Sequence, residues 1–478
     1  MKFSAKIVYA LLFTSLSFTA CAAQAADIDW KGRYRVEGIS VKNTNMQSGG
    51  TSKAYMTHHL ILDPKIVAAD GVNIYGSFGI LNNNKAYHSN SQLGSFMGSG
   101  PNSTSSTAGT TGAGDSNSLA QAQTADTLKV YRLYMNWVQE HGMLVTGRAP
   151  IDFGLGITHN SGSGVFDHWF DTRDIVGYKF TVGNMFFMPM VGKVNEGNLQ
   201  DEDDMNDYML HFQYDNPDSR LGLGVFYESR VGTRLGANDA PTSMGGTGST
   251  LTGSWETKQV SLSVTKRTDD IFFGMEAAFL NGNTGLQSAR SESVSIEAFG
   301  IATEFQYKPK NWRTTLELKA GVATGDDPSS TDKYEGFLFD RNYDVAFLMF
   351  NHVLGQYDIF RSYAGGKSPN GTQDADTETL SNVFYIVPGM NYAFSDTWSA
   401  GTKLAWANLN QKPLSNVGEI DKNVGVEWDV NVAYKPHDRL TFGLDLGMFV
   451  PGESYKGGTN RYTTDTVFGA ATKAAVSF

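Results

Sequence analysis

Apolar and polar residues alternate with a period of two in segment after segment of this chain. The clearest case is residues 424–434, where one face carries Val424, Val426, Trp428, Val430, Val432 and Tyr434. The opposite face carries Gly425, Glu427, Asp429 and Asn431. The same alternation recurs at 208–214, 260–265, 314–322 and 440–448. Successive side chains of a strand point to opposite sides, so the pattern predicts β-strands with one apolar and one polar face.

The connections between these segments alternate strictly between short and long. The short ones lie near Asp70, His141, Asn184, Asp218, Asp269, Lys310, Asp396 and His437. The long ones are 43–53, 84–126, 150–172, 195–204, 232–254, 283–291, 325–378, 410–420 and 451–462. The pattern predicts an all-β fold, a transmembrane antiparallel up-and-down β-barrel of about 18 strands with short periplasmic turns and long extracellular loops. A range of about 16–20 strands stays open, and another hairpin hidden in 325–378 would raise the count to about 20.

Both ends of the chain carry export features. Residues 1–25 have the form of a signal peptide, with Lys2 and Lys6 before an apolar run and the cleavage pattern Ala23-Gln24-Ala25. The barrel would then span 26–478. Cleavage removes Cys21, the only cysteine, and the residues before it are a poor lipidation context. The chain ends in Phe478, which resembles the signal that the outer-membrane assembly machinery reads.

Composition excludes other classes of protein. Hydrophobic residues make up 40% of the chain, and no stretch beyond the N-terminus is long and apolar enough for a membrane-spanning helix. The formal net charge is −11 without basic tracts, which argues against nucleic-acid binding. Membrane barrels tolerate such a balance, because every second strand residue can be polar.

The alternation assigns charged side chains to the lumen, because charges facing lipid are costly. The basic lumen candidates are Arg33, Arg35, Arg132, Arg148, Lys179, Arg220 and Arg230, and the acidic ones are Glu427, Asp429 and Asp445. One interpretation is a transverse field between a basic and an acidic wall. The other is the mixed charge of any wet lumen, with some charges paired.

Two long connections are unusually apolar. Residues 150–172 include Asp152, Phe153, Asp167 and Trp169, and we expect this segment either to fold inward as a constriction or to pack over the rim. Residues 325–378 contain two aromatic runs, around Phe337 and Phe347. This segment could plug the mouth or form a partner-contact patch.

The sequence predicts neither an enzyme nor a bound cofactor. It contains no H-E-x-x-H, G-x-S-x-G or P-loop motif. A weak calcium candidate is the acidic run Asp201, Glu202, Asp203 and Asp204 in an external loop. A solvated acidic loop has the same composition.

A short stretch carries a family resemblance. Leu144 to Gly154, with Gly147-Arg148 at the strand end, followed by Phe166-Asp167 and Asp171-Thr172-Arg173, resembles Gram-negative outer-membrane porins and weakly resembles the alginate-export-like family. The latter resemblance implies an Arg-rich lumen for anionic polysaccharide. Glu427, Asp429 and Asp445 do not suit that role, so the substrate is not carried over.

The sequence therefore predicts a porin of the cell outer membrane. Small hydrophilic solutes or ions would diffuse passively through a charged lumen narrowed by an inward loop. The alternatives are a non-transporting surface barrel, acting as anchor, adhesin or receptor, and an exporter of an anionic polysaccharide. The expected partners are the lipid bilayer, lipopolysaccharide, the assembly machinery and small polar solutes. A homotrimer and a monomer both remain open.

Overall fold

The computed structural model describes most of the chain after residue 26. The described ranges are 27–80, 91–92, 128–195, 205–232, 250–251, 254–287, 293–360, 379–415, 418–458 and 462–478. The predicted signal peptide at 1–25, most of the loop 84–126 and the calcium candidate at Asp201 to Asp204 lie outside these ranges. Those three expectations therefore stay predictions.

The described residues form one closed antiparallel barrel of 18 long strands, as the sequence predicted. The long strands are β1 (Asp27–Lys42), β2 (Ser52–Ala69), β3 (Val72–Ile80), β5 (Leu128–Gln139), β6 (Gly142–Pro150), β7 (Thr172–Val182), β8 (Met185–Asn195), β9 (Met205–Asn216), β10 (Leu221–Gly232), β12 (Trp255–Arg267), β13 (Ile271–Gln287), β14 (Ser293–Tyr307), β15 (Thr314–Ala323), β17 (Val383–Ala393), β18 (Trp398–Leu409), β19 (Asn423–His437), β20 (Leu440–Pro451) and β21 (Val467–Ser477). Three two-residue strands pair with the ends of long strands. β4 (Ser91–Gln92) pairs with β2, β11 (Thr250–Leu251) with β13, and β16 (Lys333–Tyr334) with β14.

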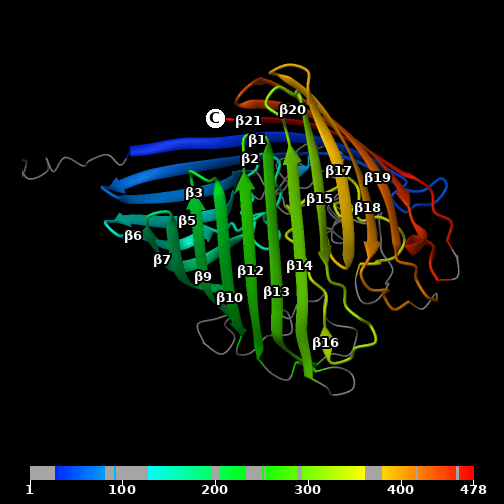
Figure 1. The fold of residues 1–478 in the computed structure, drawn as a ribbon, viewed down its shortest axis with the longest axis horizontal. Coiled ribbons are helices and arrows are strands. Elements are labelled where there is room, and N and C mark those ends of the chain that lie inside the picture. The colour runs from blue at the N-terminus through cyan, green and yellow to red at the C-terminus, as the bar shows by residue number, and fades with distance from the viewer. Residues whose placement is uncertain are drawn as a thin grey trace, which may run out of the picture.

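Consecutive long strands run side by side around the wall, and the last returns to the first (Figure 1). β1 pairs with β21 from Arg33 opposite Ser477 to Lys42 opposite Phe468. Gly32 and Phe478 extend this seam with two reciprocal backbone hydrogen bonds of 2.9 Å. Closure pairs the edges of the sheet, which would otherwise expose unpaired backbone groups.

The alternation of side chains follows from the pleat of each strand. On β19, Trp428 is 51% exposed on the outer face, whereas Glu427 and Asp429 are buried on the inner face. The ladder places Trp428 opposite Met448 of β20 and Glu427 opposite Phe449. The outer face is therefore apolar and the inner face carries the charges, as a barrel in lipid requires.

Two long connections fold into the barrel. We call residues 151–171, between β6 and β7, loop A, and the described residues 324–360 and 379–382, between β15 and β17, loop B. Loop B contributes a large share of an apolar cluster that it forms with residues of the wall strands, including Phe337, Phe339, Leu348 and Met349. The only strand in its described part is β16, which pairs parallel with β14, so the additional hairpin considered for this segment is absent from the described residues.

Helical structure is nearly absent from the described residues. In the described ranges the one 3-10 turn is η2 (Glu453–Lys456), which follows β20. In the part of the chain that the structure describes, no helix has the length and hydropathy needed to cross a membrane.

Candidate functional site

Three arginines of the barrel wall hold one side of loop A. Arg33 of β1 donates from Nη1 to the carbonyls of Ser163 (2.8 Å) and Gly164 (2.9 Å). Arg35 donates to the carbonyl of Asp167 (2.5 Å), and Arg132 of β5 donates to a carbonyl of loop A as well. A carbonyl carries no net charge, so these bonds do not neutralise the guanidinium groups.

The arginines differ in how their charge is compensated. Arg35 lies 3.2 Å from the Glu37 carboxylate, which is also 2.8 Å from His168 of loop A. Within the described residues, Arg33 and Arg132 form no ion pair. In the described residues, the positive charges of Arg33 and Arg132 are therefore not cancelled by direct contact with a carboxylate.

A buried carboxylate on another part of the wall holds the opposite side of loop A. Glu276 of β13 accepts hydrogen bonds from the backbone N–H groups of Leu155 (2.7 Å), Gly156 (2.9 Å) and Ile157 (3.2 Å). It also accepts one from the Thr158 hydroxyl (2.7 Å). Loop A is thereby held between β13 and the arginines of β1 and β5.

The local sequence of loop A explains how it wraps around this carboxylate. Gly154 and Gly156 have φ values of +55° and +82°, a conformation that favours glycine. A side chain at Gly154 would also place its Cβ 2.6 Å from the Glu276 carboxylate. The two glycines thus allow successive N–H groups to converge on a single acceptor.

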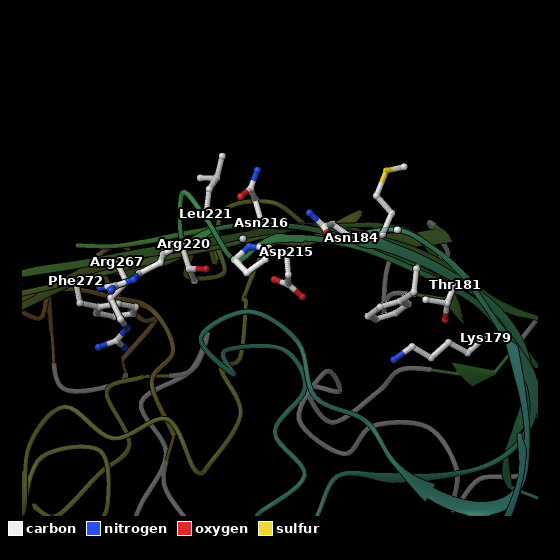
Figure 2. A pocket seen from close by; sticks show the side chains of 15 residues that line it. Lys179, Thr181, Asn184, Asp215, Asn216, Arg220, Leu221, Arg267 and Phe272 are labelled. Atoms are coloured by element: carbon white, nitrogen blue, oxygen red, sulfur yellow. The ribbon is translucent and has the colours of Figure 1, made fainter. Parts of the chain in front are cut away.

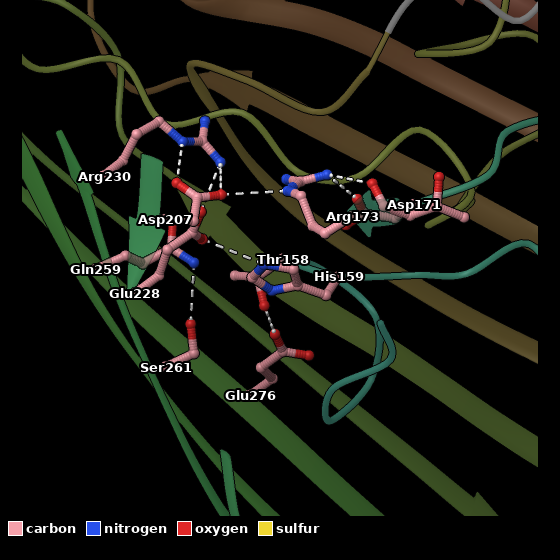
Figure 3. A network of polar contacts seen from close by, with 11 residues as sticks. Thr158, His159, Asp171, Arg173, Asp207, Glu228, Arg230, Gln259, Ser261 and Glu276 are labelled. Atoms are coloured by element: carbon pink, nitrogen blue, oxygen red, sulfur yellow. Dashed lines mark hydrogen bonds and ion pairs between the residues drawn. The ribbon is translucent and has the colours of Figure 1, made fainter. Parts of the chain in front are cut away.

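His159 and Glu228 link loop A to β10 (Figure 3). His159 Nε2 lies 3.3 Å from Glu228 Oε2, and Arg230 contacts both Glu228 (2.5 Å) and Asp207 (2.8 Å). Arg173 reaches Asp207 at 3.4 Å. Burial lowers the pKa of His159, but the hydrogen bond and charge of Glu228 outweigh it and the pKa is raised. Pairing with Glu228 favours the charged imidazole and ties loop A to the wall.

Loop B is held by a second pair of wall carboxylates. Glu427 accepts from the backbone N–H groups of Phe347 (2.8 Å), Leu348 (2.6 Å) and Met349 (2.6 Å). Asp429 also accepts from Phe347, at 3.0 Å. These carboxylates were expected to line the lumen. The structure instead covers them with loop B, because they satisfy backbone donors that the loop buries.

The two loops meet inside the barrel. The Asn342 side chain of loop B accepts from the N–H groups of His168 (3.2 Å) and Trp169 (3.1 Å) and donates to the Trp169 carbonyl (2.9 Å). The guanidinium of Arg341 lies 4.2 Å from the centre of the Trp169 ring. A backbone bond of 2.8 Å runs from Asp340 to the carbonyl of Ile157. Loops A and B are therefore one connected body across the lumen.

Asp340 lies at this junction, and its pKa is strongly raised. Burial raises the pKa of Asp340 to about 7, and the nearby Asp171 adds to the rise. The Asn342 N–H donates to the Asp340 carboxyl at 2.8 Å, which opposes the shift without cancelling it. Asp340 therefore changes charge within the physiological pH range.

Two cavities lie on the lumen side of the wall between β7 and β13. The first, of about 670 Å³, lies beside the short turns and is lined by Lys179, Arg220, Arg267 and Phe272 (Figure 2). The second, of about 370 Å³, lies against loop A and is lined by residues that include Asp152, Phe153, His159 and His211. Phe186 lines both, so the cavities are neighbours.

The remaining charged candidates take separate positions. Lys179 lies on β7, with its ammonium 3.9 Å from the centre of the Phe186 ring. Arg220 lies in the turn before β10 instead of on the wall, and pairs with Asp269 of the next turn at 2.8 Å. Asp445 of β20 pairs with Lys473 at 3.0 Å.

Arg148 corrects the expectation for β6. It forms a bidentate pair with Asp174 of β7, with both bonds 2.8 Å long. Val176 lies on the same face of β7 as Asp174, and it is 57% exposed on the outside of the barrel. Residues 143–145 are all apolar, so alternation could not decide which face of β6 points inward. Arg148 is therefore an outward residue.

The loop A candidates lie within the lumen body. Asp152 accepts from the Ser161 N–H at 2.7 Å, and Phe153 is buried against Phe226 with ring centres 5.7 Å apart. Asp167 bonds to Gly164 and Arg35 through its carboxylate and carbonyl respectively. These contacts show loop A folded inward, which was one of the two expectations for this segment.

Asn342 and Glu276 are among the residues whose contacts with loop A the sequence did not reveal. No local pattern marks an asparagine in the middle of a long loop as a contact with another loop. The alternation does point Glu276 inward, but not onto loop A. In the described part of the chain, no group of three or more His, Cys, Asp or Glu side chains could hold a metal ion.

Comparisons with known proteins agree with this fold. A family model described as a protein of unknown function, DUF481, matches residues 282–473, which is less than half of the chain. No curated protein matches. None of these findings shows the alginate-export-like family.

Three solved structures superpose on most of the chain. Pseudomonas aeruginosa OccK9 (OpdG) is 13% identical, with a TM-score of 0.50, and the match covers 95% of this chain and 98% of that protein. P. aeruginosa OccK2 (OpdF), solved in complex with glucuronate, is 11% identical with the same TM-score and coverage. A BenF-like porin from Pseudomonas fluorescens Pf-5 is also 11% identical, with a TM-score of 0.50. At these identities the match shows a shared fold.

Proposed function

We propose that this protein is an outer-membrane porin through which small hydrophilic solutes and ions diffuse passively. The observation that carries the proposal is the pair of inward loops, A and B, joined across an 18-stranded barrel. Loops held by buried wall carboxylates narrow a wide barrel without needing a separate domain. Size exclusion at this narrowing and electrostatic filtering by lumen charges provide the mechanism.

The channel is proposed to prefer anions. Arg33 and Arg132 point into the lumen and, in the described residues, have no carboxylate partner within ion-pair distance. Glu427 and Asp429, which would have opposed them, lie beneath loop B. OccK2, a protein of the same fold, was solved with glucuronate, a small carboxylate. The lumen potential would raise the local concentration of such solutes.

The placement in the membrane follows from the barrel. The apolar outer face contacts the bilayer, and the long loops face the extracellular side with its lipopolysaccharide. Phe478 at the β1–β21 seam is proposed to be read by the assembly machinery. Catalysis forms no part of the proposal. Mass measurement of the detergent-solubilised protein distinguishes a homotrimer from a monomer.

Planar-bilayer recording tests the proposal. Refolded barrel is added to a bilayer under a KCl gradient, and single-channel conductance and reversal potential are measured. We expect discrete conductance steps and a reversal potential of the sign that anion flow produces. Fully folded barrel that inserts without conducting would instead support a non-transporting surface barrel that serves as anchor, adhesin or receptor.

A further inference from the structure

Asn342 occupies an unusual position in the lumen. It lies in loop B, between β15 and β17, yet all three hydrogen bonds of its side chain go to loop A. Both the acceptor oxygen and the donor nitrogen of the amide are used. An amide that offers both kinds of group to one backbone segment fixes its position and its orientation.

Loop B is anchored firmly enough for Asn342 to act as a fixed point. The Asn342 N–H is held by the Asp340 carboxyl, and Lys319 of β15 donates to the carbonyl of Asp344 at 3.2 Å. A few residues further along, Glu427 accepts from Leu348 and its neighbours, and the apolar cluster buries this part of loop B. The part of loop B that carries Asn342 is therefore attached to the barrel wall.

The segment that Asn342 holds is the part of loop A that follows the arginine contacts. His168 lies next to Asp167, whose carbonyl accepts from Arg35, and the His168 ring contacts Glu37. Glu276 holds only residues 155–158, so it does not restrain this segment directly. The position of His168 and Trp169 thus depends on contacts from loop B and from β1.

We propose that Asn342 is a positioning residue of the channel, which sets the width of the passage by holding the His168–Trp169 segment of loop A against loop B. The inference rests on the proposed porin function. Asn342 acts through the backbone of loop A and need not touch the solute. Its removal weakens the attachment of the His168–Trp169 segment to loop B, while the backbone bond from Asp340 to Ile157 remains.

The size of the effect follows from the number of bonds. Each net hydrogen bond contributes about a factor of five to an equilibrium. Loss of three bonds in Asn342→Ala is therefore expected to raise the population in which the His168–Trp169 segment is detached from loop B by roughly two orders of magnitude. Separation appears in recordings as larger open-channel current fluctuations and a changed mean conductance.

Asn351 offers a matched control within loop B. Its side chain donates to the carbonyl of Ala346, at 2.8 Å, in the same loop. Asn351→Ala removes an asparagine bond from loop B without touching loop A. It is expected to keep the wild-type current fluctuations, and Asn342→Asp, which keeps the two acceptor contacts, is expected to fall between wild type and Asn342→Ala.

The experiment records wild type and the three variants in planar bilayers, with heat-modifiable gel mobility as the check that each barrel is folded. Increased fluctuations in Asn342→Ala but not in Asn351→Ala support the inference. A merely structural role would lower the melting temperature of Asn342→Ala and leave the current of folded channels unchanged, which overturns it. If Asn342→Ala does not fold, the comparison rests on Asn342→Asp. A silent wild type refutes the porin function, whereas conducting channels indifferent to residue 342 refute only this inference.

Discussion

Replacement of Glu276 by alanine is expected to release loop A from β13. The carboxylate is fully buried and accepts three consecutive backbone N–H groups and one hydroxyl. The bonds from Gly156 and Ile157 are buried, so alanine leaves two buried donors unpaired, at about 1–3 kcal/mol each. Docking of loop A is then weakened by about 2–6 kcal/mol, a factor of about 30 to 10⁴ in its equilibrium.

Single-channel recording measures this release. We expect Glu276→Ala to show larger current fluctuations than wild type, and a shift in conductance when loop A leaves its docked position. Glu276→Gln is the matched variant, because its amide oxygen occupies nearly the same place and can accept the same N–H groups. It is expected to behave more like wild type than like alanine.

Comparison of the current noise of wild type, Glu276→Gln and Glu276→Ala tests whether the Glu276 hydrogen bonds hold loop A. If folded Glu276→Ala channels have the conductance, ion selectivity and current noise of wild type, then the Glu276 contacts do not hold the constriction. If Glu276→Gln and Glu276→Ala are equally altered, the negative charge matters and the count of hydrogen bonds does not. Either result would refute the reasoning from backbone donors.

The same recordings test two further predictions, and the yield of folded barrel tests a third. Arg132→Gln is expected to reduce anion preference, seen as a smaller reversal potential, while the outward Arg148→Gln leaves it unchanged; equal effects would contradict the assignment of faces. The pKa of Asp340 is raised from 3.8 to about 7. The neutral carboxyl of Asp340 therefore stabilises the docked loops fully below about pH 4. This stabilisation is lost as the pH rises through about 7. Current fluctuations should grow over that interval in wild type and stay flat in Asp340→Asn; no difference between the two would mean that Asp340 does not affect the docking of the loops. Deletion of Phe478 removes two seam bonds and is expected to lower the yield of heat-modifiable barrel, so a normal yield would count against its role in assembly.

Much of the wall could be predicted from local pattern. Trp428 and Glu427 fall on opposite faces because a pleated strand has a period of two, and that period is visible in the sequence. The number of strands follows from the alternation of connection lengths. Where the pattern is uniform, as at residues 143–145, the face is undetermined, and Arg148 was therefore placed on the wrong side.

The path of the loops could not be predicted, because it depends on contacts between residues far apart in the chain. Glu276 binds a segment about 120 residues earlier, and Asn342 binds one about 170 residues earlier. Backbone N–H groups are present at almost every position, so no residue pattern shows which of them meet a given carboxylate. The acidic wall inferred at Glu427 and Asp429 became, in the folded chain, the attachment of loop B.

The sequence by itself determined a barrel, because alternation and turn chemistry are local properties that each strand repeats. Only the tertiary structure decided how the barrel is narrowed, since closure brings β1, β13 and β19 around one lumen. Charged side chains of β1 and β13 then hold loop A, and those of β19 hold loop B. Arg33 and Arg132 retained charge toward the lumen because carbonyls, not carboxylates, became their partners. Which groups contact these two arginines depends on the folded path of loop A. The proposed anion preference rests on their uncancelled charge.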